Sequence, residues 1–154
     1  DYAAPTGTPI KAAADGEVIF KKYSPMGEMG AVSAELAEAL ARTAGMSCAI
    51  CDRDAVIAAA GGAKKDILER SISSELEQLM ERRECYERGA DEQPEVLISS
   101  QDGCAVVAEA PIITDGDVSG CVAFVSEKED EKADDVLLKL CQSAAQFLSK
   151  RIAV

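Results

Sequence analysis

Histidine and tryptophan are absent from this 154-residue chain, and aromatic residues make up only 4% of it. Without histidine, the chain lacks the commonest general base and a frequent zinc ligand. The sequence also has no nucleophile beside a base and no pair of carboxylates at a spacing that suits acid–base chemistry. We therefore expect no catalytic residues, no cofactor and no enzymatic activity.

Basic residues are scarce as well. The chain has 16 lysines and arginines against 28 acidic residues, which gives a formal net charge of −12. Such an excess of acid repels nucleic-acid phosphates and anionic lipids, so we expect neither duplex DNA nor a membrane as a direct partner. No apolar run is long enough to cross a bilayer, and no signal peptide is visible.

Small apolar residues are plentiful. The chain is 47% hydrophobic, which suffices for one domain with a core of alanine, valine, isoleucine and leucine. Most of its six cysteines lie inside apolar runs and should act as small buried hydrophobes: Cys48, Cys51, Cys85, Cys104, Cys121 and Cys141. Free thiols favour a reducing compartment, hence the cytoplasm.

Cys48 and Cys51 form a CxxC pair, which in other contexts binds zinc or carries redox chemistry. In a strand, however, residues three apart point to opposite faces, and no second CxxC is present to complete a site. We expect structural thiols and no metal ligands, with a metal or redox role as the alternative.

The stretch Ser47–Ser73 organises the chain. Ser47–Asp52 and Ala55–Ala60 read as two strands around an Asp52-Arg53-Asp54 turn, because Asp bonds readily to nearby backbone. Gly61 and Gly62 then break the strand and lead into a short helix, Lys64–Arg70.

The remaining elements follow from periodicity and capping signals. Two hydrophobic stripes predict long helices at Pro25–Ala44, ended by Gly45, and at Asp130–Ile152. Ser73 or Ser74 should cap a helix, with Ser74 and Glu77 spaced as a capping box. The expected strands are Glu95–Ser99, Cys104–Thr114 interrupted at Pro111, and Gly120–Ser126, which should be central and buried on both faces. The charged run Glu81–Glu92 reads as a solvated helix end and loop.

This element order predicts an α+β fold, an antiparallel sheet with helices on one side. Residues 1–23 form a separate unit, a β-hairpin around Asp15-Gly16, and residues 24–154 form the main domain. Both long helices carry more apolar surface than one sheet needs. We therefore expect a homodimer or homotetramer through Pro25–Ala44 and Asp130–Ile152.

Lys64 and Lys65 are a positive spot in an acidic chain, directly after a glycine hinge. We predict a pocket for a small anionic molecule lined by Gly61–Ser73, with strand residues near Cys104–Val107 and Val122–Phe124. Lys64, Lys65, Ser71 and Ser73 are its candidate ligand contacts. The alternative is that both lysines are merely solvated at a helix start.

From Asp15 onward the chain resembles the stage V sporulation protein T (SpoVT) family of transcription factors. The matching pieces keep order and spacing: DGEVIFKKYSP, Ile50–Asp54, Val56–Ala58, Lys64–Asp66, Ser71–Ser73, Gly116-Asp117 before Gly120, and Ala144, Ala145, Phe147 and Leu148. The resemblance implies a GAF-like domain that senses a small molecule and sets oligomeric state. The alternative is a ligand-free assembly domain of the same fold. DNA would be bound only through an AbrB-type domain whose basic half is missing here.

Residues 1–18, DYAAPTGTPIKAAADGEV, also resemble lysostaphin-like zinc endopeptidases, with Asp1 at the position of a zinc-binding aspartate. The chain has no histidine to complete a zinc site, so the chemistry excludes a peptidase. The two resemblances together suggest a chimera, natural or artificial, joined near Asp15-Gly16.

Overall fold

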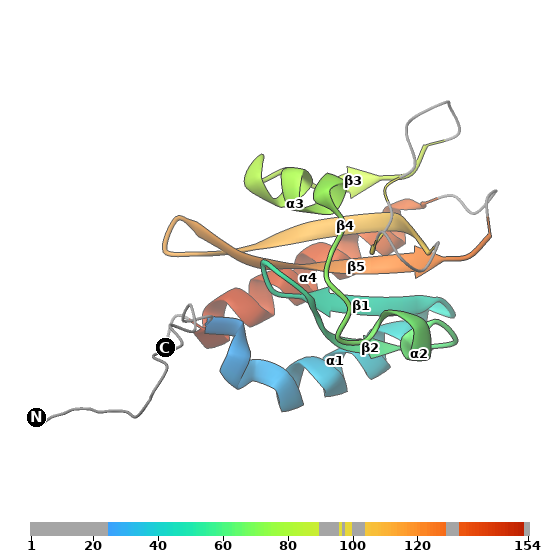
Figure 1. Ribbon diagram of the computed structural model, residues 1–154, viewed down its shortest axis with the longest axis horizontal. Coiled ribbons are helices and arrows are strands. Elements are labelled where there is room, and N and C mark those ends of the chain that lie inside the picture. The colour runs from blue at the N-terminus through green and yellow to red at the C-terminus, as the bar shows by residue number, and fades with distance from the viewer. Residues whose placement is uncertain (1–24, 90–95, 97, 100–103, 129–132, 153–154) are drawn as a thin grey trace, which may run out of the picture.

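The computed structural model describes residues 25–89, 96, 98–99, 104–128 and 133–152 (Figure 1). Its elements in chain order are the 3₁₀ helix η1 (Pro25–Met29), α1 (Gly30–Ala44), β1 (Ser47–Cys51), β2 (Val56–Ala60), α2 (Lys64–Ile67), α3 (Ser74–Glu81), β3 (Tyr86–Glu87), β4 (Ala105–Thr114), β5 (Asp117–Ser126) and α4 (Asp135–Ile152). The hairpin expected at residues 1–23 lies outside the described residues, so that domain boundary stays a prediction.

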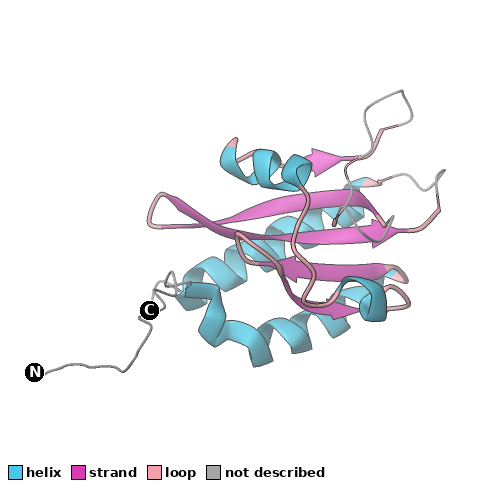
Figure 2. Cartoon of the chain, viewed as in Figure 1, coloured by secondary structure: helices cyan, strands magenta, loops and turns pink. Residues whose placement is uncertain are grey.

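The five strands form one antiparallel sheet in the order β2–β1–β5–β4–β3 (Figure 2). Asp52 makes the β1–β2 turn as expected, because its Oδ1 accepts hydrogen bonds from the N–H groups of Asp54 and Ala55 at 2.7 and 2.8 Å. Asp115 and Gly116 make the β4–β5 turn with φ values of 52° and 84°, the left-handed pair that a two-residue hairpin requires. The α+β fold and its antiparallel sheet are confirmed.

Helices cover both faces of the sheet (Figure 1). Buried residues of α1 and α4, such as Leu40 and Leu148, pack on one face. Ile67 of α2 and Leu76 of α3 pack on the other face. The prediction of helices on one side only was therefore wrong, because α2 and α3 also bury apolar side chains against the sheet.

β5 lies at the centre of the sheet and is buried from Ser119 to Val125. Val122 and Phe124 belong to the core on the α1–α4 side. Cys121 and Ala123 belong to the core on the α2–α3 side. This confirms the prediction that the strand is central and buried on both faces.

Both long helices begin later than predicted. The first turn after Pro25 is 3₁₀, and α1 begins at Gly30 without a side-chain cap, which is consistent with the low helix propensity of the glycines there. Gly45 ends α1 with φ 68°, as expected. α4 begins at Asp135 because Asp134 Oδ1 accepts a hydrogen bond from the Leu137 N–H at 2.9 Å.

α2 ends at Ile67, earlier than the predicted Arg70. The chain then turns extended and runs back along the β1–β2 hairpin, where Arg70 O accepts from the Val56 N–H at 2.9 Å and Asp54 O accepts from the Ile72 N–H at 3.0 Å. Ser73 then caps α3, because its Oγ accepts from the Leu76 N–H at 3.1 Å. The cap is therefore the first of the two predicted serines, not the one in the Ser74–Glu77 spacing.

β4 continues through Pro111, where an interruption was predicted. Among the described residues, β3 pairs with Ala108 and Glu109 and no strand pairs with that side of β4 at Pro111. The missing N–H of proline is tolerated at such an edge. β3 itself lies in the charged run that was read as helix end and loop. The strand predicted at 95–99 falls mostly outside the described residues, and Val96, Ile98 and Ser99 belong to no named strand.

Gly120 of β5 passes very close to β1. A Cβ atom built on Gly120 would lie 2.0 Å from the Cys51 carbonyl oxygen, a backbone atom that cannot rotate away. We predict that Gly120→Ala lowers the free energy of unfolding by about 2 kcal/mol or more. Gly62→Ala is the control, since no atom lies within 4 Å of its added Cβ. Equal urea midpoints for the two variants would contradict this account.

Glu109 of β4 is a charged residue type in the core. It is 0% exposed, and neither carboxyl oxygen has a hydrogen-bond partner among the described residues. Burial raises the pKa of Glu109 from an ordinary 4.5 to about 8. The carboxyl group is therefore protonated in the folded chain at neutral pH.

This burial predicts an unusual pH dependence of stability. Because the folded pKa of Glu109 lies above the unfolded one, the unfolded state loses this proton first as pH rises. The contribution of Glu109 to the free energy of unfolding should be complete below about pH 4.5. The free energy of unfolding should then fall by up to about 5 kcal/mol toward about pH 8. Urea unfolding of Glu109→Gln should lack this slope, whereas Glu87→Gln, which alters an exposed side chain of β3, should keep it. A parent chain whose stability rises over this range would contradict the assignment.

Candidate functional site

The four predicted ligand contacts do not share a pocket among those described here. Lys64 and Lys65 are exposed on α2, and Ser71 is exposed where the chain bridges to Ala55. Ser73 is 2% exposed, and its hydroxyl group caps α3. The strand segments expected beside them, Cys104–Val107 and Val122–Phe124, are buried in the sheet. Ligand binding by these residues stays a prediction.

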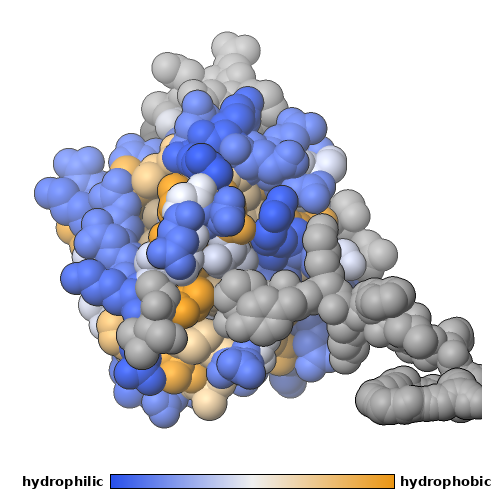
Figure 3. All heavy atoms as spheres, turned by 90° about the vertical axis from the view of Figure 1, so that its left-hand side faces the viewer, coloured by the Kyte–Doolittle hydropathy of each residue, from blue (hydrophilic) through white to orange (hydrophobic). Residues whose placement is uncertain are grey.

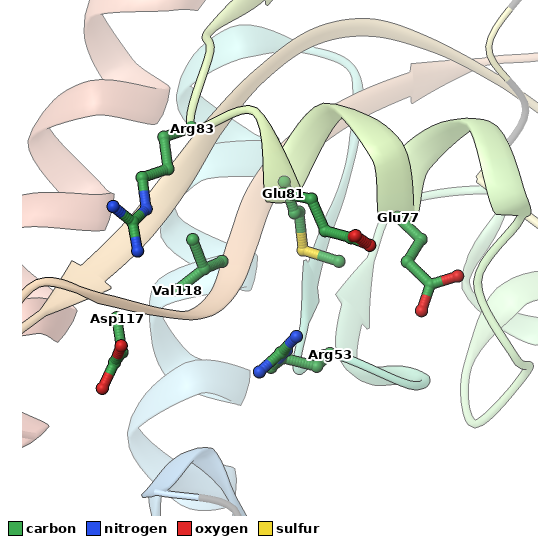
Figure 4. Close-up of a pocket in the computed structure, with 7 residues that line it drawn as sticks. Arg53, Glu77, Glu81, Arg83, Asp117 and Val118 are labelled. Carbon is green, nitrogen blue, oxygen red and sulfur yellow. The ribbon is translucent and has the colours of Figure 1, made fainter.

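A pocket of about 360 Å³ lies instead between the end of α3 and the β1–β2 and β4–β5 hairpins (Figure 4). Its lining comes from three segments far apart in the sequence: Arg53, Glu77, Met80, Glu81, Arg83, Asp117 and Val118. Figure 3 faces the end of the molecule where both hairpin turns lie, and it shows hydrophobic surface between hydrophilic side chains.

Local structure sets the position of each charged group. Arg53 lies at the tip of the turn that the Asp52 carboxylate holds. Glu77 and Glu81 are one helical turn apart on α3 and therefore share a face. Arg83 follows α3 with a left-handed φ of 59°, and its N–H donates to Met80 O at 2.9 Å.

Arg53 and Arg83 have no ion-pair partner among the residues that the structure describes. Within the described part of the chain, the one ion pair joins Arg82 and Glu84, at 3.6 Å. In a chain of net charge −12, these two guanidinium groups lie beside one pocket, and no described carboxylate comes within 4.0 Å of either. Both groups are therefore available to a ligand.

The pocket also has an apolar part. Met80 is only 2% exposed and Val118 is half-buried. An apolar surface beside a few oriented charges is the usual composition of a small-molecule site. This arrangement can bind and orient a ligand, and its described groups offer no nucleophile paired with a base.

Sequence reasoning missed this site for identifiable reasons. Arg83 lies in the charged run 81–92, to which no role was given. Arg53 lies within the Ile50–Asp54 segment that carried the family resemblance, so that motif was the signal that could have found it. Because Arg53 was interpreted only as a turn residue, its side chain was not considered as a ligand contact.

A second pocket, of about 510 Å³, lies between α4 and the open edge of β4. Arg83 also lines this pocket, together with Cys85, Pro111, Gln142 and Lys150 among others. Cys85 Sγ accepts a hydrogen bond from Gln142 Nε2 at 3.5 Å. Arg83 therefore borders both pockets.

The buried thiols suit a structural role. Cys48 and Cys51 belong to cores on opposite faces of the sheet, so they do not converge on one metal ion. Burial raises the pKa of Cys48 well above its ordinary value and that of Cys141 to about 12. A hydrogen bond with Cys51, together with burial, raises the pKa of Cys121. Such thiols stay protonated and are poor nucleophiles and metal ligands.

The described part of the chain contains neither a metal-binding cluster nor a membrane-spanning helix. No group of three or more acidic or cysteine side chains there could hold a metal ion. None of the described helices is both long and apolar enough to cross a bilayer.

Solved structures share this architecture. The GAF domain of a phosphoenolpyruvate-protein phosphotransferase from Acinetobacter aligns with a TM-score of 0.61 and 12% identity, over 86% of this chain and 84% of that one. The cofactor-binding GAF domain of the nutrient sensor CodY from Clostridium difficile aligns with a TM-score of 0.56 and 16% identity, over 77% of this chain and 83% of that one. At these identities the likeness shows a GAF fold.

Sequence comparison is more specific. Residues 28–153 match the family described as stage V sporulation protein T C-terminal, transcription factor. The chain is 37% identical over 138 residues to stage V sporulation protein T of Bacillus subtilis (strain 168), which covers 90% of this chain and 76% of that protein. The resemblance of residues 1–18 to zinc endopeptidases finds no support in these comparisons. The chain belongs to the stage V sporulation protein T family of transcription factors, with a GAF-type C-terminal fold.

Proposed function

We propose that this chain is a regulatory domain that senses a small molecule and sets the oligomeric state of its transcription factor. Family membership supports the regulatory role. One observation carries the sensing role: Arg53 and Arg83, both without ion-pair partners among the described residues, border one pocket with an apolar side. This role is non-enzymatic and cytoplasmic, and DNA is contacted through a separate domain.

The pocket joins three segments that lie far apart in the sequence. A ligand held between Arg53 and Arg83 would tie the β1–β2 turn to the end of α3, and Asp117 would add the β4–β5 turn. A ligand shifts a conformational equilibrium only by its difference in affinity for the two states. Fixing the relative positions of these segments supplies such a difference.

The sensing role predicts a ligand-dependent rise in melting temperature. In a thermal-shift screen of metabolites, a ligand should stabilise the parent chain by mass action, by about 2.7 kcal/mol at a hundred times its Kd. Arg53→Gln and Arg83→Gln should each reduce this stabilisation. Arg82→Gln is a matched control, since Arg82 neighbours Arg83 but pairs with Glu84 and lies outside the pocket. Ligands that stabilise all four proteins equally would locate sensing elsewhere, for example at Lys64 and Lys65.

The oligomeric role rests on the outer surface of α4. Val136 and Phe147 are 61% and 46% exposed, and they lie with the half-buried Leu140 along one side of the helix. Water-exposed side chains of this size favour burial against a second copy, through α1 and α4 of each chain. A ligand-free assembly domain of the same fold, the second candidate function, would rest on this observation alone.

We predict that Val136→Asp and Phe147→Asp weaken self-association without unfolding the domain, because both side chains are exposed in the single chain. Sedimentation at micromolar concentration should show a dimer or tetramer for the parent and a monomer for the variants. Lys139→Asp, at an exposed position of the same helix, should keep the parent's state. A parent chain that sediments as a monomer would refute the oligomeric role.

A further inference from the structure

We propose that the Arg53–Arg83 pocket binds a small zwitterion, a molecule with one carboxylate and one ammonium group on a short apolar body. Free α-amino acids are the simplest members of this class. The inference rests on the proposed sensing function and names the chemistry of its ligand. Three properties of the pocket support it: its cationic groups, its balance of charge, and its size and apolar side.

The cationic groups suit a carboxylate. Arg83 reaches from the end of α3 toward Val118, and Arg53 lies across the pocket from Glu77 and Glu81 (Figure 4). A guanidinium group presents a planar fork of N–H donors that matches the two oxygens of a carboxylate. Because neither arginine has an ion-pair partner among the described residues, no internal pair must break when the ligand enters.

The charge balance excludes simpler ligands. The lining has two guanidinium groups and three carboxylates, those of Glu77, Glu81 and Asp117. A molecule with several phosphate groups would be repelled by the carboxylates, and a plain amine would leave both arginines unpaired. A zwitterion satisfies both sets, with its carboxylate on the arginines and its ammonium group on the acidic side chains of α3.

The size and the apolar side of the pocket are the third property that supports a zwitterion. The volume of about 360 Å³ is at the lower end for small-molecule sites. Met80 and Val118 give this space an apolar side that polar ligands would leave unused. A short aliphatic or thioether side chain fits both properties.

The experiment compares three forms of one molecule. Isothermal titration calorimetry on the full chain first tests each of the twenty free L-amino acids. For each one that binds, the matching amine without the carboxylate and the matching acid without the ammonium group are then titrated; for leucine these are isoamylamine and 4-methylpentanoate. Inorganic phosphate and adenosine monophosphate serve as purely anionic probes.

We expect at least one amino acid to bind. Each matched analogue should bind with an affinity at least about ten-fold lower, because it loses one charged contact. Arg53→Gln and Arg83→Gln should also weaken binding about ten-fold, and Arg82→Gln should leave it unchanged. All three arginines are exposed, so the unliganded variants should melt with the parent, and Arg53→Lys should restore part of the affinity.

Each other outcome overturns a distinct claim. If phosphate, the nucleotide or the acids without an ammonium group bind more tightly than every amino acid, and Arg53→Gln abolishes this, the zwitterion is wrong and the sensing pocket stands. If an amino acid binds equally well to Arg53→Gln and Arg83→Gln, the assignment to this pocket is wrong. If neither these probes nor the metabolite screen yields a ligand, the inference and the sensing function fail together.

Discussion

Burial of β5 on both faces is the constraint on which the rest of this structure depends. A strand with apolar residues on both sides needs a cover on each, and the chain provides α1 and α4 for one face and α2 and α3 for the other. Within the sheet, the pairing of β1 with β5 brings Cys51 O so close to position 120 that only glycine fits there. The cover on both faces also keeps water away from Glu109 on the neighbouring strand β4. Its carboxyl group therefore stays protonated in the folded chain.

A sheet that is covered on both faces leaves its ends for chemistry. The candidate site lies at the end where two hairpin turns meet the last turn of α3 (Figure 4). Loops on a rigid scaffold are where binding residues usually gather, because their side chains need not satisfy the core. Here four of the five charged groups have a local anchor: the Asp52 carboxylate for Arg53, the helix for Glu77 and Glu81, and a left-handed backbone for Arg83.

Short-range patterns in the sequence predicted the parts of the fold that depend on neighbours in the chain. The β1–β2 hairpin, the Gly45 helix end, a serine cap at position 73 or 74 and the burial of β5 follow from a few adjacent residues. The structure has them, with the cap at Ser73. Features that depend on distant pairing could not be predicted in this way. β3 consists of two residues whose strand partner in the described part of the chain is β4. α2 ends early because Arg70 bonds to the β1–β2 hairpin. The pocket joins segments whose charges look solvated when each segment is read alone.

The pocket borders α3, and α4 covers the other face of the sheet. Coupling between sensing and assembly therefore has two routes: through the sheet, or through Arg83, which also lines the pocket beside α4. Within the sheet, β5 reaches both the pocket and the α4 side: Val118 lines the pocket near the start of the strand, and Phe124 packs toward α1 and α4 further along. A strand that is buried on both faces is stiff because close-packed neighbours allow it few alternative positions. Coupling energies of 1–3 kcal/mol are typical of allosteric domains, about as much as one charge-assisted hydrogen bond contributes. A ligand that draws Arg53 and Arg83 together could therefore bias assembly through a small shift of the β4–β5 hairpin, without any rearrangement of the core.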